Sequence, residues 1–167
     1  MKALQISRRR TFDLVNAPVP RLDPNETDQI VVRTAFVSIC GSDIPFFNGT
    51  NARVAYPLPP GAHVHECVGE VVASSSPGFQ PGDFVTAIPD HDAGLAEHFL
   101  ARGTRAALLP QALHGQGEAC IIQPLATVLN AVDQLGDVQG KSIAVLGLGS
   151  IGLMFCWLLG LRRAGEV

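Results

Sequence analysis

The sequence has few cysteines, few charged residues and few aromatic side chains. Its 167 residues include four cysteines, 16% charged and 6% aromatic residues. No two cysteines form a Cys-x-x-Cys pair and no secretory signal precedes the first strand-like stretch, so the pattern favours reduced thiols in a cytoplasmic protein over a disulfide framework. The formal net charge of −3 offers no basic surface, and we expect no nucleic-acid partner.

One apolar stretch, residues 143–161, is almost as long as the roughly 20 residues that a membrane-spanning helix needs. However, Gly147, Gly149, Ser150 and Gly152 crowd its middle. A buried strand, a glycine turn and a helix packed on a sheet explain this stretch better than a membrane span does. We therefore expect no membrane partner.

Short strand-like stretches, separated by proline and glycine, run through the first 110 residues. They are rich in apolar and β-branched residues and lie at residues 1–6, 30–39, 65–75, 84–88, 95–101 and 106–110. Residues 13–29 are rich in proline, aspartate and asparagine and are predicted to be loop. Short strands at regular intervals indicate a mainly β, barrel-like unit.

The pattern changes to helical spacing after residue 110, with apolar side chains at Ile122, Leu125, Leu129 and Val132. Pro124 should lie near the start of this helix and Gly136 should end it. Residues 141–147, KSIAVLG, contain an unbroken apolar run from Ile143 onward. They are predicted to form a buried strand of the parallel type.

A Gly-x-Gly-x-x-Gly pattern, Gly147, Gly149 and Gly152, follows this predicted strand and precedes a predicted helix. The three glycines would permit a tight turn, the approach of backbone to a pyrophosphate, and close packing of helix on strand. The first helical residues, Ser150 and Ile151, would add free N–H groups that attract an anion. The pattern predicts a site for NAD or NADP, and a glycine-rich turn without a ligand is the alternative.

Two histidines, a glutamate and a cysteine lie within five residues, in the sequence HVHEC at positions 63–67. If this segment is a strand, His63, His65 and Cys67 share one face and could form a local metal site. Alternatively, His63 is a solvated loop residue and Cys67 a small residue of the core.

Six ordered motifs resemble those of the medium-chain, zinc-dependent alcohol and polyol dehydrogenases. They are CGSD from Cys40, HECVGEVV from His65, GFQPGDFV from Gly78, GLAEHF from Gly94, QPLATVLNAV from Gln123, and the glycine turn. The resemblance covers nearly the whole chain. It implies a GroES-like, partly open β-barrel followed by the first β-α unit of a Rossmann-type α/β domain. The implied ranges are 1–115 for the GroES-like catalytic domain, 116–140 for connecting helices and 141–167 for the beginning of the dinucleotide-binding domain.

The resemblance also implies a zinc-dependent, NAD(P)-linked oxidoreductase of the alcohol, polyol or threonine dehydrogenase type, acting on a small alcohol or polyol. Cys40, His65 and Glu66 would bind Zn²⁺, Ser42 would relay the alcohol proton, and Asp43 would orient a ligand. Zinc favours thiolate and imidazole ligands with one position left open, and it lowers the pKa of a bound oxygen group.

Several features depart from the family's pattern. Gln123 stands where the polyol-type members have a glutamate ligand, and a neutral amide is a poorer zinc ligand than a carboxylate. No cysteine occurs in residues 88–99, so the family's separate structural zinc lobe is expected to be absent. Asp90, His91 and Asp92 would form a polar turn there, either exposed or in contact with metal or substrate.

The end of the sequence at Val167 predicts a truncated chain that is inactive alone, or a homo-oligomer that covers the exposed apolar surface of the last helix. Two alternative functions follow from these departures. One is a non-catalytic metal-binding or assembly module derived from the family. The other is a zinc-free quinone or enoyl reductase, which the pairing of Cys40 with His65 and Glu66 disfavours.

Overall fold

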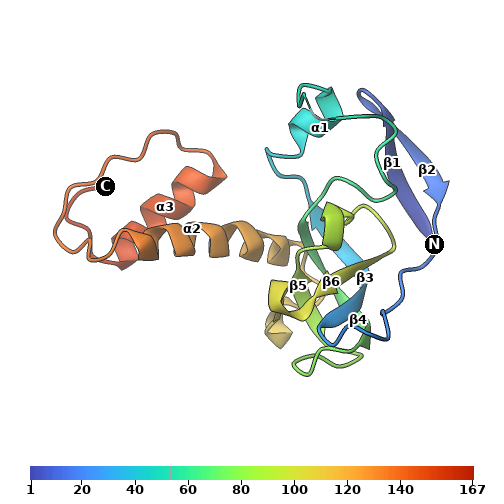
Figure 1. The fold of residues 1–167 in the computed structure, drawn as a ribbon. Coiled ribbons are helices and arrows are strands. Elements are labelled where there is room, and N and C mark those ends of the chain that lie inside the picture. The colour runs from blue at the N-terminus through green and yellow to red at the C-terminus, as the bar shows by residue number, and fades with distance from the viewer. Residues whose placement is uncertain (53) are drawn as a thin grey trace. The chain divides into compact units, whose positions relative to one another are not determined.

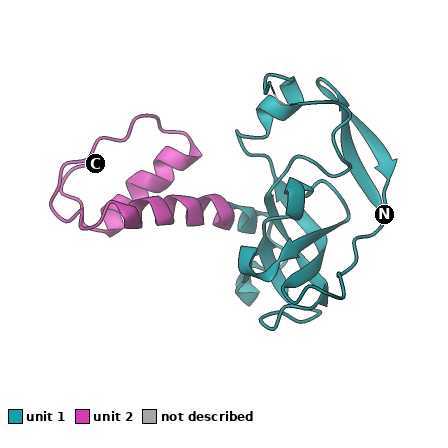
Figure 2. Ribbon diagram, viewed as in Figure 1, with its two compact units in different colours: residues 1–121 teal, residues 122–167 magenta. Residues whose placement is uncertain are grey.

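A computed structural model describes residues 1–52 and 54–167 of the chain. These residues form two compact units, Met1–Ile121 and Ile122–Val167 (Figure 2). Each unit has its own hydrophobic core.

The first unit is built mainly from antiparallel strands (Figure 1). A five-stranded sheet has the order β6-β3-β4-β5-β7, and β1 pairs with β2 in a separate two-stranded sheet. The strands are β1 (Lys2–Arg8), β2 (Thr11–Asn16), β3 (Gln29–Ser38), β4 (Glu66–Ser74), β5 (Phe84–Ala87), β6 (His98–Arg102) and β7 (Ala106–Leu108). The described strands do not close into a ring, because β6 and β7 lie at the two edges of the sheet. The predicted GroES-like, partly open barrel is confirmed.

Short helical segments lie between these strands or follow the last of them. They are α1 (Ile44–Asn48), η1 (Asp90–Asp92), η2 (Gly103–Arg105), η3 (Gln111–Leu113) and η4 (Gly117–Ile121). The sequence did not predict α1. Pro45 lies in its first turn. Gly49 follows its last residue, and the φ of 67° at Gly49 lies in the left-handed region that favours glycine.

The core of the first unit lies on the five-stranded sheet. Its buried residues are Ile30, Val32, Val64, Cys67, Val71, Val85, Ala87, Phe99 and Ala101. Most come from β3, β4, β5 and β6, so the β-branched runs that predicted these strands also supply the core.

The prediction that residues 13–29 are loop is wrong for its first part. Thr11–Asn16 form β2, which pairs antiparallel with β1 through a turn at Arg9 and Arg10. Arg10 adopts a φ of 58° in this turn. An arginine in the left-handed region gives no turn signal in the sequence, so the hairpin was not predicted.

The second unit contains α2 (Ile122–Gln134) and α3 (Ser150–Leu161), whose buried faces form a small core with Val138. Pro124 lies in the first turn of α2, and Gly136 follows the helix with a φ of 69°, as predicted.

The predicted strand at residues 141–147 is wrong. The segment makes one parallel bridge, between Ser142 and Glu166, and otherwise forms no described strand. A buried parallel strand depends on hydrogen bonds from neighbouring strands. In the described part of the chain, residues 165 and 166 lie opposite this segment: Ile143 N donates to Glu166 O at 2.9 Å, and Gly165 N donates to Lys141 O at 3.0 Å.

The last helix exposes large apolar side chains, as the sequence predicted. Leu153, Trp157 and Leu161 of α3 are more than half exposed in the described chain. Within the described residues, no helix is both long and apolar enough to cross a bilayer.

All four cysteines are free thiols.

Candidate metal centre

The antiparallel pairing of β3 with β4 places the end of one strand beside the start of the other. Ser38, the last residue of β3, lies opposite Glu66, the first residue of β4. Cys40 follows β3 by two residues and His65 immediately precedes β4. The register of the sheet therefore brings together two segments that lie 25 positions apart in the sequence.

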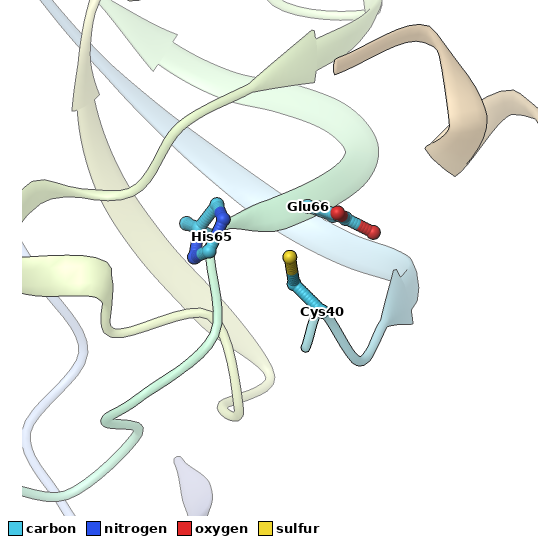
Figure 3. A group of neighbouring side chains, drawn as sticks. All are labelled: Cys40, His65 and Glu66. Carbon is cyan, nitrogen blue, oxygen red and sulfur yellow. The ribbon is translucent and has the colours of Figure 1, made fainter. Parts of the chain in front are cut away.

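Cys40, His65 and Glu66 lie together at this point (Figure 3). Each offers one ligand atom, and these atoms all lie within 4.8 Å of one another. Glu66 is buried, whereas Cys40 and His65 are half-buried. A thiolate, an imidazole and a carboxylate at this spacing fit Zn²⁺, which takes nitrogen, sulfur and oxygen ligands at about 2.0–2.3 Å. Partial exposure leaves room for a further ligand.

Glu66 is held by the strand opposite. The Ser38 hydroxyl donates a hydrogen bond to Oε2 of Glu66. This bond uses one of the two carboxylate oxygens of Glu66. A buried carboxylate needs such a partner, because burial without one is costly.

Asp43 contacts two of these three residues, Cys40 and His65. Its Oδ2 accepts a hydrogen bond from the backbone N–H of Cys40 at 2.8 Å, and its Oδ1 lies 3.4 Å from Nδ1 of His65. Asp43 is only 5% exposed. A carboxylate that contacts one ring nitrogen of a histidine orients the other nitrogen toward a metal. The orienting role that the sequence analysis expects of Asp43 stays a prediction, and this contact is the one it would use.

His63 also contacts Asp43, with its Nδ1 3.2 Å from Oδ1. Its Nε2 lies 3.1 Å from Oδ2 of Asp92. His63, His65 and Asp43 form a second group of closely spaced potential ligand atoms. His63 is therefore not a solvated loop residue, and the turn at residues 90–92 is not simply exposed, because Asp92 faces His63.

The alternative site made of His63, His65 and Cys67 is not formed. Strand β4 begins at Glu66, so the alternation of a strand does not extend back to His63. Cys67 is fully buried in the core, and burial raises the pKa of its thiol. Among the described residues, neither closely spaced ligand group includes Cys67. The prediction that Cys67 is a core residue is confirmed.

Ser42 is exposed in the turn between Cys40 and α1. Gln123 belongs to the second unit, at the start of α2.

The glycine turn precedes α3 as predicted. Gly147 has a φ of 97°, and Gly149 is the residue before the first turn of the helix. A Cβ at either position would meet no atom within 4 Å, whereas a Cβ at Gly152 would lie 1.9 Å from Gly147 O. Gly152 thus allows the helix to lie against the turn, and the backbone at Gly147 and Gly149 remains open to a ligand. Ser150 and Ile151 form the exposed first turn of α3.

Sequence reasoning missed Ser38, and it named Asp92 only as part of a polar turn that is either exposed or in contact with metal or substrate. Ser38 had a signal, because its position two residues before Cys40 on a predicted strand places it near the site. The contact of Asp92 with His63 depends on the path of the loop between β5 and β6, for which the sequence offers only a cluster of polar residues.

Comparison with known proteins finds a family model and relatives that match this chain. Residues 26–136 match the model of the alcohol dehydrogenase GroES-like domain. Sorbitol dehydrogenase of Bacillus subtilis is 26% identical over 92% of this chain and 51% of its own length. The zinc-type alcohol dehydrogenase-like protein YdjJ of Escherichia coli is 30% identical over 86% of this chain and 49% of its own. The chain thus spans about half the length of these relatives.

Solved structures share the fold. Galactitol-1-phosphate dehydrogenase from Escherichia coli matches 98% of this chain and 54% of its own, with a TM-score of 0.80 and 20% identity. A Sinorhizobium meliloti protein, solved bound to NADP, matches 98% of this chain and 54% of its own, with a TM-score of 0.75 and 27% identity.

Proposed function

This chain belongs to the medium-chain, zinc-dependent alcohol dehydrogenase family, and from that premise we propose that it carries the metal-binding part of a zinc-dependent, NAD(P)-linked oxidoreductase. The observation that carries the proposal is the gathering of Cys40, His65 and Glu66 within 4.8 Å. Relatives named sorbitol dehydrogenase, D-xylulose reductase A and L-threonine 3-dehydrogenase support a small alcohol or polyol as substrate.

In the proposed site, Cys40, His65 and Glu66 hold Zn²⁺. When bound there, zinc polarises the oxygen of an alcohol and lowers the pKa of its hydroxyl group. Cys40 supplies a thiolate, which is the deprotonated form that binds metal. Glu66, fixed by Ser38, supplies a carboxylate of the kind that Gln123 cannot supply.

Ser42 is proposed to move the proton of the alcohol. Its hydroxyl is exposed, two residues after Cys40, so Oγ can accept a proton from the substrate hydroxyl while its own proton passes to solvent. Such a relay matches the role that the family resemblance implies for this residue.

The glycine turn is proposed to bind the pyrophosphate of NAD or NADP, whose nicotinamide ring accepts hydride in such reactions. Open backbone at Gly147 and Gly149, the N–H groups of Ser150 and Ile151, and the close packing at Gly152 support this site. In this proposal residues 1–115 are the catalytic domain, residues 116–140 connect, and residues 141–167 begin the nucleotide domain of a cytoplasmic homo-oligomer.

Metal content tests the proposal. Protein purified with zinc, dialysed and analysed by mass spectrometry should hold about one zinc per chain, and Cys40→Ala and His65→Ala should hold almost none. Cys156→Ala is the matched control, because Cys156 is a half-buried free thiol in the other unit. Zinc-free wild type, or zinc retained in Cys40→Ala, would contradict the proposed site.

The second candidate function is a metal-binding or assembly module without catalysis. The exposed apolar side chains of α3 favour it, because they suit an interface. Equilibrium dialysis with NAD and NADP separates the two functions: zinc bound without measurable nucleotide binding supports the module, and binding that is lost in Gly149→Val supports the oxidoreductase.

A further inference from the structure

A row of four side chains leads from the proposed metal ligand to the loop between β5 and β6. His65 Nδ1 lies 3.4 Å from Asp43 Oδ1, the same oxygen lies 3.2 Å from His63 Nδ1, and His63 Nε2 lies 3.1 Å from Asp92 Oδ2. Both nitrogens of His63 thus face a carboxylate. Asp43 contacts His65 directly, and His63 and Asp92 extend the row beyond it.

The surroundings of this row make its contacts strong. The side chains of Asp43 and His63 are 6% and 18% exposed. They border a cavity of about 230 Å³ whose other lining residues are apolar: Ile6, Phe12, Ile39, Ile44, Phe47, Val64 and Leu95. Contacts between polar groups gain strength in such a medium, and an unpaired carboxylate there is costly. A carboxylate accepts hydrogen bonds only, so His63 donates at least one in either protonation state.

We propose that His63 is a positioning residue for the metal ligands, acting through Asp43, and that Asp92 holds His63 in place. This proposal rests on the proposed zinc site. Asp43 contacts the backbone N–H of Cys40 with one oxygen and the ring of His65 with the other, so its orientation affects two ligands at once. His63 is the side chain that fixes this orientation from behind.

His63 is itself held from three sides. Its ring stacks on Phe46 with the centroids 3.8 Å apart and the planes at 15°. Asp43 and Asp92 occupy its two nitrogens. A ring held in this way has one orientation. Its contact with Asp43 in turn fixes the orientation of the Asp43 carboxylate.

Asp92 contacts the segment from His63 to His65 through its backbone as well as through its side chain. Val64, between the two histidines, donates from its N–H to Asp92 O at 2.7 Å, and its carbonyl accepts from Gly94 N at 3.1 Å. Asp92 adopts a φ of 53°, in the left-handed region that an aspartate tolerates better than most residues. The loop between β5 and β6 therefore takes part in placing His65.

Zinc affinity tests the inference. In wild type, His63→Leu and Asp92→Gly, the dissociation constant for Zn²⁺ is measured by competition with a chromophoric chelator. Loss of such outer partners weakens metal binding by about 10–100-fold, so we expect at least a tenfold rise for His63→Leu and a smaller rise for Asp92→Gly. Glycine suits the backbone of position 92, so this variant removes the carboxylate without strain. His91→Asn, at the exposed neighbouring position, is the control and should bind zinc as wild type does.

Cobalt in place of zinc gives a second readout. The charge-transfer band of a thiolate on cobalt should persist in His63→Leu, while its d–d bands shift because the ligands are less well fixed. His63→Gln, whose amide can donate to Asp43, should recover part of the affinity. A purely structural role would lower the thermal stability of the metal-free protein and leave the dissociation constant unchanged.

The outcomes separate this inference from the proposed function. If the wild-type protein binds no zinc, the proposed function itself is wrong. If wild type binds zinc and Cys40→Ala does not, a dissociation constant for His63→Leu within twofold of wild type overturns the inference. If His63→Leu does not fold, Asp92→Gly decides by the same criterion. A wild-type cobalt complex without the thiolate band would place the ion among Asp43, His63 and His65 and would also overturn it.

Discussion

Ser38 and Glu66 face each other across β3 and β4, and the serine hydroxyl donates a hydrogen bond to the glutamate carboxylate. This contact fixes the buried carboxylate of Glu66. Without it, the carboxylate would lose its hydration and gain no hydrogen bond in return. The contact also holds the carboxylate that we propose as the third ligand of the candidate metal centre.

We predict that Ser38→Ala destabilises the metal-free protein more than the zinc-bound protein. An unpaired buried polar group costs about 1–3 kcal/mol, and bound zinc would give the Glu66 carboxylate a new partner. Unfolding by urea in the presence of chelator and then of excess zinc measures both values. Ser142→Ala, at an exposed position in the second unit, is the control and should change neither. Equal losses with and without zinc would indicate that Glu66 does not bind the metal.

A second prediction concerns the packing beneath the site. A Cβ at Gly94 would lie 2.3 Å from Cys67 Sγ and 2.8 Å from Val64 O. Gly94→Ala should therefore lower the free energy of unfolding by about 1–3 kcal/mol, the usual cost of overpacking. Gly78→Ala is the control, because nothing lies within 4 Å of its Cβ.

The double variant Cys67→Ala with Gly94→Ala checks the cause. Removal of Sγ relieves one of the two close contacts, so the two substitutions together should cost less than the sum of their separate effects. Strict additivity would show that Gly94 is needed for another reason.

Much of the first unit could be predicted from its sequence, because strands buried on the core side consist of β-branched and apolar runs. The pairing of Cys40 with His65 was predicted from the family motifs. Spacing alone does not show that two segments separated by 25 positions in the sequence meet in the fold. The row from Asp43 through His63 to Asp92 could not be predicted. It joins three separate segments, and its contacts depend on the course of two loops.

The errors have physical causes. Residues 141–147 have the composition of a buried parallel strand, but composition gives a tendency only, and the ladder forms where neighbouring strands supply hydrogen bonds. Strand β2 was missed because Arg10 adopts a left-handed conformation that the sequence does not announce. In both cases the local pattern was weaker than the tertiary context.

A third prediction concerns acid stability. Asp28 accepts hydrogen bonds from Ser76 Oγ at 2.9 Å and from the hydroxyl and the N–H of Thr104 at 2.9 and 3.2 Å. These bonds, that of Ser76 first, lower the pKa of the Asp28 carboxyl below its usual value. The folded state then favours the ionised form, so the stabilisation is present above about pH 4 and is lost as the pH falls through the lowered pKa.

The difference in unfolding free energy between wild type and Asp28→Asn should consequently shrink as the pH is lowered from 6 to about 2.5. NMR titration gives a direct check, because Ser76→Ala should raise the pKa of Asp28 toward its ordinary value. An Asp28 pKa that is the same in Ser76→Ala and wild type would contradict the assigned cause.

The last prediction concerns the junction of the glycine turn with α3. A Cβ at Gly152 would lie 1.9 Å from Gly147 O and 2.9 Å from Gly147 C, and neither backbone atom can move without reshaping the turn. Gly160, in the same helix, has nothing within 4 Å of its Cβ. Gly152→Ala should therefore reduce the protection of α3 amides against hydrogen exchange. Gly160→Ala should preserve or raise it, since alanine favours a helix over glycine by up to about 1 kcal/mol.

The amide of Leu153 is the most informative probe, because it donates to Gly149 O at 2.9 Å in the first turn of the helix. Its exchange should accelerate in Gly152→Ala, while the amides of β3 and β4 in the other unit exchange as in wild type. If the exchange of Leu153 is unchanged in Gly152→Ala, then the helix does not depend on close contact with the turn, and the glycine at position 152 would have no packing role in the proposed nucleotide site.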